Sequence, residues 1–175
     1  MYNGQDLRGW KGLEANPVKR RLLSADTLAL LQVKADEVMR SGWEAKGEEL
    51  HFTGHGDNLC SVKDYQDFEM YVDWKIEKEG DAGIYLRGSP QVQIWDTALT
   101  RVGAQVGSGG LYNNQINPRI PLKVADTPVE EWNTFRIIMK GERVTVYLNG
   151  ELVVDKAILE NYWDRKIPIF LKDAI

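Results

Sequence analysis

The spacing of apolar residues predicts β-strands through most of the chain after residue 42. The clearest strand covers residues 67–77, where every second position is apolar. This alternation is typical of a strand that buries one face and exposes the other. Shorter strands are expected at 50–52, 59–62, 83–87, 91–95, 132–140, 143–148 and 151–155. Asn149-Gly150 is a hairpin-turn dipeptide, and so many turn-bounded strands favour an all-β sandwich.

One helix is predicted ahead of these strands. Residues 25–40 contain no Gly or Pro, and Ser24 is placed to cap their N-terminus. Spacings of three and four residues define one buried apolar stripe: Leu28, Leu31, Ala35 and Val38. We interpret the helix, over about 24–40, as a packing element with a solvated charged face: Lys34, Asp36, Glu37 and Arg40. Asn16-Pro17 is expected to break the chain before it.

Three predicted strands carry unusual residues on their outward faces. Most exposed strand faces are lined by small polar or charged residues, but here aromatic, amide and charged side chains follow one another: Tyr71, Asp73, Tyr85, Arg87, Gln91, Gln93 and Trp95. If the strands are antiparallel neighbours, these side chains form one polar-aromatic patch. Such a patch suits carbohydrate, because planar polar groups bind hydroxyls while rings stack on the sugar. The other interpretation is an ordinary solvated face with tolerated aromatics.

The connection over residues 97–131 is long and contains several glycines and prolines. Loops of this length are uncommon in compact domains unless they are functional. We expect Gly107–Gly110 to form a flexible turn that brings Tyr112 to the patch.

Composition and charge narrow the classes of function. The 175 residues predict a single domain over 1–175, and the net charge of −4 argues against a nucleic-acid partner. No stretch approaches the roughly 18 apolar residues that span a bilayer. The single cysteine, Cys60, excludes an internal disulfide and a multi-cysteine zinc site. Its apolar neighbours predict a small buried hydrophobe, and the oligomeric state stays open.

Cofactor signals are weak. His51, His55 and Asp57 have a spacing that could hold a divalent cation, but a solvated loop is the favoured interpretation. The sequence has no phosphate loop, dinucleotide fingerprint or nucleophile elbow, so we expect no cofactor. Residues 1–10 lack the charged and apolar regions of a signal peptide. The protein is therefore expected to be cytoplasmic, or periplasmic or in the cell envelope if a signal was removed before residue 1.

Several segments, taken in order, resemble the 3-keto-disaccharide hydrolase domain family, long described as a domain of unknown function. They are Tyr2–Trp10, Asp67–Glu69, Gly83–Gly88, Gln91–Asp96, Gly110–Tyr112, Glu131–Thr134 and Leu148–Gly150. The resemblance implies a concanavalin A-like jelly roll with a sugar site on its concave sheet, and makes the helical segment an insertion. It also implies that the closing strands, and part of the site, lie beyond Ile175.

The resemblance further implies cleavage of a glycoside that is oxidised at C3. The ketone acidifies the C2 proton, so a base can form an enolate, the C1 substituent leaves, and water then adds. On this hypothesis Arg87 stabilises the oxyanion, Asp73 is the base, and Tyr85 or Tyr71 is the proton donor. Gln91, Gln93 and Trp95 position the sugar together with Tyr112. Asp73 is equally interpreted as an ion-pair partner of Arg87.

Two other functions remain open at this point. The same fold class carries lectins, so a non-catalytic carbohydrate-binding domain is the main alternative. A structural or adhesion module of a larger envelope protein is the other, and it predicts that Tyr85, Arg87 and Trp95 are covered by a partner.

Overall fold

The computed structural model describes residues 1–88 and 90–169. These residues fall into two compact units, Met1–Asp64 and Tyr65–Ile175, which are described separately below. That the whole chain is a single domain stays a prediction. The closing strands that the resemblance implies lie beyond Ile175, outside the described residues.

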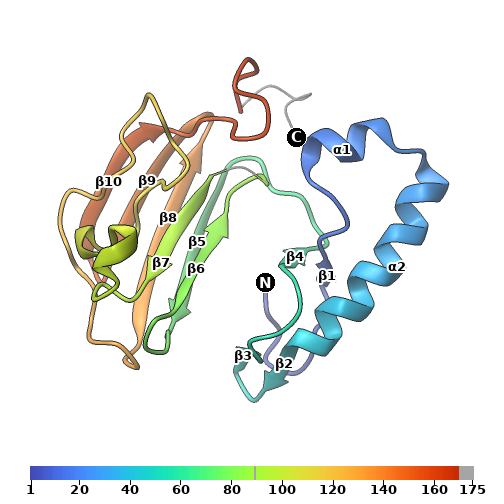
Figure 1. Cartoon of the computed structure of the whole chain (residues 1–175), viewed down its shortest axis with the longest axis horizontal. Coiled ribbons are helices and arrows are strands. Elements are labelled where there is room, and N and C mark those ends of the chain that lie inside the picture. Colours follow the sequence, from blue (N-terminus) through green and yellow to red (C-terminus); the bar gives the residue numbers. More distant parts are fainter. Residues whose placement is uncertain (89, 170–175) are drawn as a thin grey trace. The chain divides into compact units, whose positions relative to one another are not determined.

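The first unit combines two helices with short antiparallel strand pairs (Figure 1). Strand β1 (Trp10–Gly12) pairs with β4 (Leu59–Ser61), and β2 (Trp43–Lys46) pairs with β3 (Glu49–Phe52). The predicted helix is confirmed as α2 (Ala25–Gly42), and the Ser24 side chain accepts a hydrogen bond from the Thr27 backbone N–H at 3.2 Å.

Three details of the helical prediction are wrong. Asn16-Pro17 starts a short helix, α1 (Pro17–Leu22), because Asn16 caps the Lys19 N–H and proline suits the first helical turn. The apolar stripe of α2 ends on Met39, which is 1% exposed, and not on Val38, which is 44% exposed. Asp36 is not simply solvated, because it accepts the Gly12 backbone N–H at 2.9 Å and so ties α2 to β1.

The second unit holds an all-β sandwich, as predicted. Four strands form one antiparallel sheet in the order β10-β9-β8-β5: β10 (Glu151–Ile158), β9 (Arg143–Leu148), β8 (Asn133–Lys140) and β5 (Phe68–Trp74). Strands β6 (Asp81–Tyr85) and β7 (Gln91–Trp95) form a separate antiparallel pair. Inward side chains of both sheets share one buried core, which includes Trp74, Val92, Ile94, Phe135 and Val146.

The long connection carries two 3-10 turns, η1 (Thr100–Val102) and η2 (Ala104–Val106), and then runs beside β7 (Figure 1). The Gln93 N–H donates to the Gly110 carbonyl at 2.9 Å, and the Gly109 N–H donates to the Gln93 carbonyl at 2.8 Å. Gly107–Gly110 is therefore buried and bonded to β7, and is not the flexible turn that we expected. A Cβ at Gly109 would come within 2.7 Å of the Val153 side chain, which accounts for glycine there.

Candidate functional site

The outer face of β6 and β7 gathers polar and aromatic side chains at one place. The strand register puts Tyr85 opposite Gln91, Gly83 opposite Gln93, and Asp81 opposite Trp95. These residues alternate with the inward-facing Ile84, Val92 and Ile94, so they share the face that turns away from the core. Tyr112 joins them from the connection, because its backbone N–H donates to the Gln91 carbonyl at 3.3 Å. We call this surface the β6–β7 face.

A chain of amide hydrogen bonds organises the β6–β7 face. Gln91 Nε2 donates to Gln93 Oε1 at 2.6 Å, and Gln93 Nε2 donates to Asp81 Oδ1 at 2.7 Å and to the Ala82 carbonyl at 3.0 Å. Gln93 is 2% exposed, whereas Asp81 is exposed. Because buried polar groups need partners, Gln93 has a fixed position, and its bond fixes one oxygen of the exposed Asp81 carboxylate.

Three partly exposed tyrosines border these polar groups: Tyr85, Tyr112 and Tyr162. Burial raises the pKa of Tyr85 above its ordinary value, and the nearby Tyr162 and Asp81 raise it further. The Tyr85 hydroxyl therefore holds its proton at neutral pH. The Arg119 guanidinium lies 5.8 Å from the centre of the Tyr112 ring, so a permanent positive charge stands at this border.

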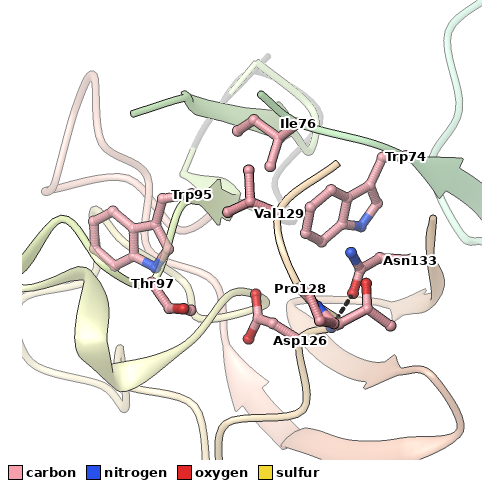
Figure 2. Close-up of a pocket in the computed structure, with 9 residues that line it drawn as sticks. Trp74, Ile76, Trp95, Thr97, Asp126, Pro128, Val129 and Asn133 are labelled. Atoms are coloured by element: carbon pink, nitrogen blue, oxygen red, sulfur yellow. Dashed lines mark hydrogen bonds between the residues drawn. The ribbon is translucent and has the colours of Figure 1, made fainter. Parts of the chain in front are cut away.

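Trp95 lies on this face by alternation, but it does not form an open stacking platform. It is 6% exposed, packs with Leu99 and Ala104, and donates from Nε1 to the Gly107 carbonyl at 3.0 Å. Figure 2 shows its indole beside a small cavity that is also lined by Trp74. That cavity has about 10 Å³ of space, enough for one water molecule and too little for a sugar.

Arg87 is buried away from the expected patch. It adopts a positive φ of 52° just after β6, and only 1% of its side chain is exposed. Its Nε donates to the Gln66 carbonyl at 2.9 Å, and its Nη2 lies 3.2 Å from Asp67 Oδ1. Burial lowers the pKa of Arg87, and Asp67 opposes that effect. Its ion-pair partner is thus Asp67, and not Asp73.

Tyr71 and Asp73 stand on the other sheet. Their strand, β5, pairs with β8 and not with β6, so the three expected neighbouring strands are not neighbours. Asp73 accepts a hydrogen bond from Thr134 Oγ1 at 2.5 Å, and the Tyr71 hydroxyl donates to Glu69 at 3.2 Å. Because both sheets turn their inner faces to one core, the outer face of β5 points away from the β6–β7 face. The residues that we predicted to form one patch therefore lie on two separate surfaces, one on β5 and one on β6 and β7.

Sequence reasoning missed three residues at this site: Asp81, Arg119 and Tyr162. Asp81 lies two residues before Gly83, where we expected its strand to begin, so the prediction left it out of the patch. The hairpin register offered a usable signal, since pairing Tyr85 with Gln91 continues outward to pair Asp81 with Trp95. No comparable signal marked Arg119 or Tyr162, which reach the face from irregular segments.

The described part of the chain contains no cluster of three metal-ligating side chains. His51 Nε2 lies 2.7 Å from Glu49, and His55 Nδ1 lies 3.4 Å from the Thr53 carbonyl, so each ring contacts its own strand or loop. No helix in the described residues has the length and apolarity needed to cross a membrane.

The protein is thus an antiparallel β-sandwich, and its two-stranded β6–β7 sheet carries amide, carboxylate and tyrosine side chains on the outer face. The family model of the 3-keto-alpha-glucoside-1,2-lyase-like domain matches residues 1–174. The chain therefore belongs to this carbohydrate-active family, that of the 3-keto-disaccharide hydrolase domain. The resemblance read from the sequence motifs is confirmed.

Two solved structures from Parabacteroides distasonis ATCC 8503, both described provisionally as glycosyl hydrolases, are similar to this chain. The first is 19% identical with a TM-score of 0.62, and the match covers 99% of this chain and 73% of that one. The second is 22% identical with a TM-score of 0.45, covering 60% of this chain and 61% of that one. The first supports the fold assignment. No curated protein matches the chain.

Proposed function

We propose that the protein cleaves 3-keto glycosides on the β6–β7 face, by elimination followed by hydration. One observation carries the proposal: a carboxylate, a tyrosine hydroxyl and two hydrogen-bonded amides share one outer face of the β6–β7 pair. The family description supplies the substrate class, because it names a 3-keto-alpha-glucoside lyase. The β6–β7 face provides groups for each proton transfer that this reaction needs.

The proposed reaction begins at C2 of the sugar. The Asp81 carboxylate takes the C2 proton, and the electron pair forms an enolate with the C3 oxygen. The enolate collapses, a C1–C2 double bond forms, and the C1–O bond breaks. The Tyr85 hydroxyl gives its proton to the departing oxygen, so the leaving group is an alcohol. Water then adds across the C1–C2 double bond. Its hydroxyl joins C1 and its proton goes to the Tyr85 phenolate, while Asp81, after exchange with solvent, gives a proton to C2. The free 3-keto sugar is released and both side chains are back in their starting states.

Asp81 replaces Asp73 as the proposed base because Asp81 shares a face with Tyr85. Asp81 is close enough for its charge to contribute to the raised pKa of Tyr85. Asp73 lies on the outer face of the other sheet and is bonded to Thr134. Arg119 likewise replaces Arg87 as the cation for the enolate oxygen, since Arg87 is buried against Asp67. Electrostatic stabilisation of this kind is commonly a large catalytic term.

The remaining residues of the β6–β7 face are assigned to sugar binding. Gln91 retains an amide N–H that is not needed for its bond to Gln93, so it can donate to a sugar hydroxyl. The exposed parts of the Tyr112 and Tyr162 rings offer apolar surface to the CH groups of the sugar. Tyr71 and Trp95, which we expected here, have no part in this version of the site.

The proposal is tested by comparing the activities of variants at two carboxylates, Asp81 and Asp73. With 3-keto-trehalose as substrate, Asp81→Asn and Tyr85→Phe are each expected to lower kcat/KM by about 100-fold or more, because a general acid or base contributes that much. Asp73→Asn is the matched control and is expected to stay within about two-fold of wild type, since its carboxylate is far from the reacting sugar on this proposal. Loss of activity in Asp73→Asn with activity retained in Asp81→Asn would overturn the assignment.

A carbohydrate-binding role without catalysis is the second candidate. The observation that favours it is the residue type at Gln91 and Gln93, because two amides bind hydroxyls but transfer no protons. Calorimetry with trehalose and 3-keto-trehalose, followed by analysis of the products, separates the two functions. Binding of both sugars without release of a reducing sugar would replace the enzyme proposal with the lectin-like one.

A further inference from the structure

An open hollow lies on the long connection beside the β6–β7 face. Residues 116–120 line it, its volume is about 390 Å³, and it is wide open to solvent. Two isoleucines on this hollow are strongly exposed, Ile116 at 92% and Ile120 at 59%. Side chains of this size gain free energy when a ligand removes them from water.

Arg119 links the hollow to the proposed sugar site. Arg119 is one of the residues that line the hollow, and the same guanidinium lies 5.8 Å from the Tyr112 ring centre. Tyr112 in turn is bonded through its backbone to Gln91. A substrate with its sugar on the β6–β7 face therefore has one end close to residues 116–120.

The backbone that carries the hollow is held in place by the partly buried carboxylate of Glu160. Glu160 Oε1 accepts the backbone N–H groups of Ile116 and Asn117, each at 2.7 Å, and Oε2 accepts that of Gln115 at 2.9 Å. Arg165 pairs with the same carboxylate at 2.8 Å. The exposed isoleucines thus lie on a segment whose backbone is already ordered. Ligand binding therefore carries no free-energy cost for ordering the loop.

The chemistry of the lining indicates what would bind there. Ile116, Pro118 and Ile120 present hydrocarbon, and the side-chain amide of Asn117 already donates to Glu160 at 3.1 Å. A second sugar as leaving group would find few polar partners for its hydroxyls. A flat apolar ring would instead cover both isoleucines and remove them from water.

We infer that this hollow is the leaving-group subsite and that it takes an aryl aglycone, so the preferred substrates are aryl 3-keto-glucosides. The inference rests on the proposed function, because it identifies the leaving group of that reaction. It makes Ile116 and Ile120 specificity-determining residues that act on binding and take no part in proton transfer. In the elimination step, the bond between C1 and the phenolic oxygen breaks and the phenol leaves with the proton from Tyr85.

The test compares two substrates that differ only in the aglycone, 4-methylphenyl 3-keto-α-glucoside and methyl 3-keto-α-glucoside. Ile116→Ser and Ile120→Ser are each expected to raise KM for the aryl substrate by about 10-fold, the usual scale for loss of an apolar contact. KM for the methyl substrate is expected to change less than about two-fold. Leu122→Ser is the matched control, because Leu122 is 66% exposed on the same connection but does not line the hollow.

Each outcome has a definite meaning. Equal effects of the variants on both substrates, or an effect of Leu122→Ser as large as that of Ile116→Ser, would overturn the aglycone subsite while leaving the proposed function intact. Turnover of neither substrate would overturn the proposed function. Calorimetry with phenyl α-glucoside would then still test the hollow. If the hollow binds the aryl group, Ile116→Ser binds this glucoside more weakly than wild type does. A dimer that Ile116→Ser dissociates would identify the hollow as a contact between copies of the chain and overturn the inference.

Discussion

Gln93 is the residue around which the β6–β7 face is ordered. It is 2% exposed, yet its amide accepts from Gln91 and donates to Asp81 and to backbone carbonyls. An unpaired buried amide would cost free energy, so these bonds give the side chain one position. The sequence placed Gln93 on the correct strand face, but alternation alone could not indicate that it is buried by its neighbours.

Gly83 gives Gln91 room to lie over β6. A Cβ at Gly83 would come within 2.7 Å of Gln91 Cδ and Oε1. Gly83→Ala is therefore expected to lower the free energy of unfolding by about 1–3 kcal/mol, the usual cost of overpacking, and to weaken sugar binding. Chemical denaturation measures the first effect. The double variant Gly83→Ala/Gln91→Ala should recover part of the loss, whereas fully additive losses would contradict this explanation.

The pH dependence of the reaction tests the role of Tyr85. An ordinary tyrosine has a pKa near 10, and burial raises the pKa of Tyr85 above that. The acid must be protonated to donate, so the alkaline fall of kcat caused by this group is expected above about pH 10. In Tyr85→Phe that limb should vanish from the residual activity. An alkaline limb that is unchanged in Tyr85→Phe would assign the proton donor to another group.

At the scale of elements, the strands could be predicted and their pairing could not. Alternation identified β5, β8 and β9 closely, because their burial alternates along the strand. It also located β7, where apolar and polar residues alternate although both faces of the strand are buried. Alternation contains no information about which strand lies beside which. The chain crosses from one sheet to the other between β5 and β6, and this separates Asp73 from Tyr85.

The 115–120 segment depends on Glu160 for its position. Burial alone would raise the pKa of Glu160, but bonds from Asn117, Gln115 and Ile116 lower it overall. Glu160→Gln is expected to destabilise the fold by about 1–3 kcal/mol, because charged hydrogen bonds and the Arg165 pair are lost. Urea denaturation of both proteins measures this difference.

The sign of the pH effect follows from the lowered pKa of Glu160. The unfolded value is about 4.3, so the stabilisation is complete above that pH and is lost as the pH falls through the folded pKa. The difference in stability between wild type and Glu160→Gln should therefore shrink in acid. A constant difference from pH 7 to about pH 3 would show that the carboxylate charge does not matter.

At the scale of the whole molecule, the fold class and the family could be predicted from the sequence. Turn-bounded strands indicated the sandwich, and short motifs spread over the chain indicated the family that the model match confirms. The site was less predictable, because Arg87, which we expected at the oxyanion, instead forms a buried contact with Asp67 away from the β6–β7 face. The position of Asp81 on the β6–β7 face follows from the hairpin register, which pairs it with Trp95.

The central claim is elimination at C2, and the fate of the C2 hydrogen tests it most directly. A 3-keto glycoside carrying deuterium at C2 would be turned over by the wild-type protein in ordinary water for short times. Each sample would then be quenched with borohydride, which reduces the ketones of product and remaining substrate and stops further exchange at C2. Our account predicts that the label is lost to solvent, because Asp81 removes it before the C1–O bond breaks. A trapped product that keeps its deuterium would show direct hydrolysis at C1 and contradict the account.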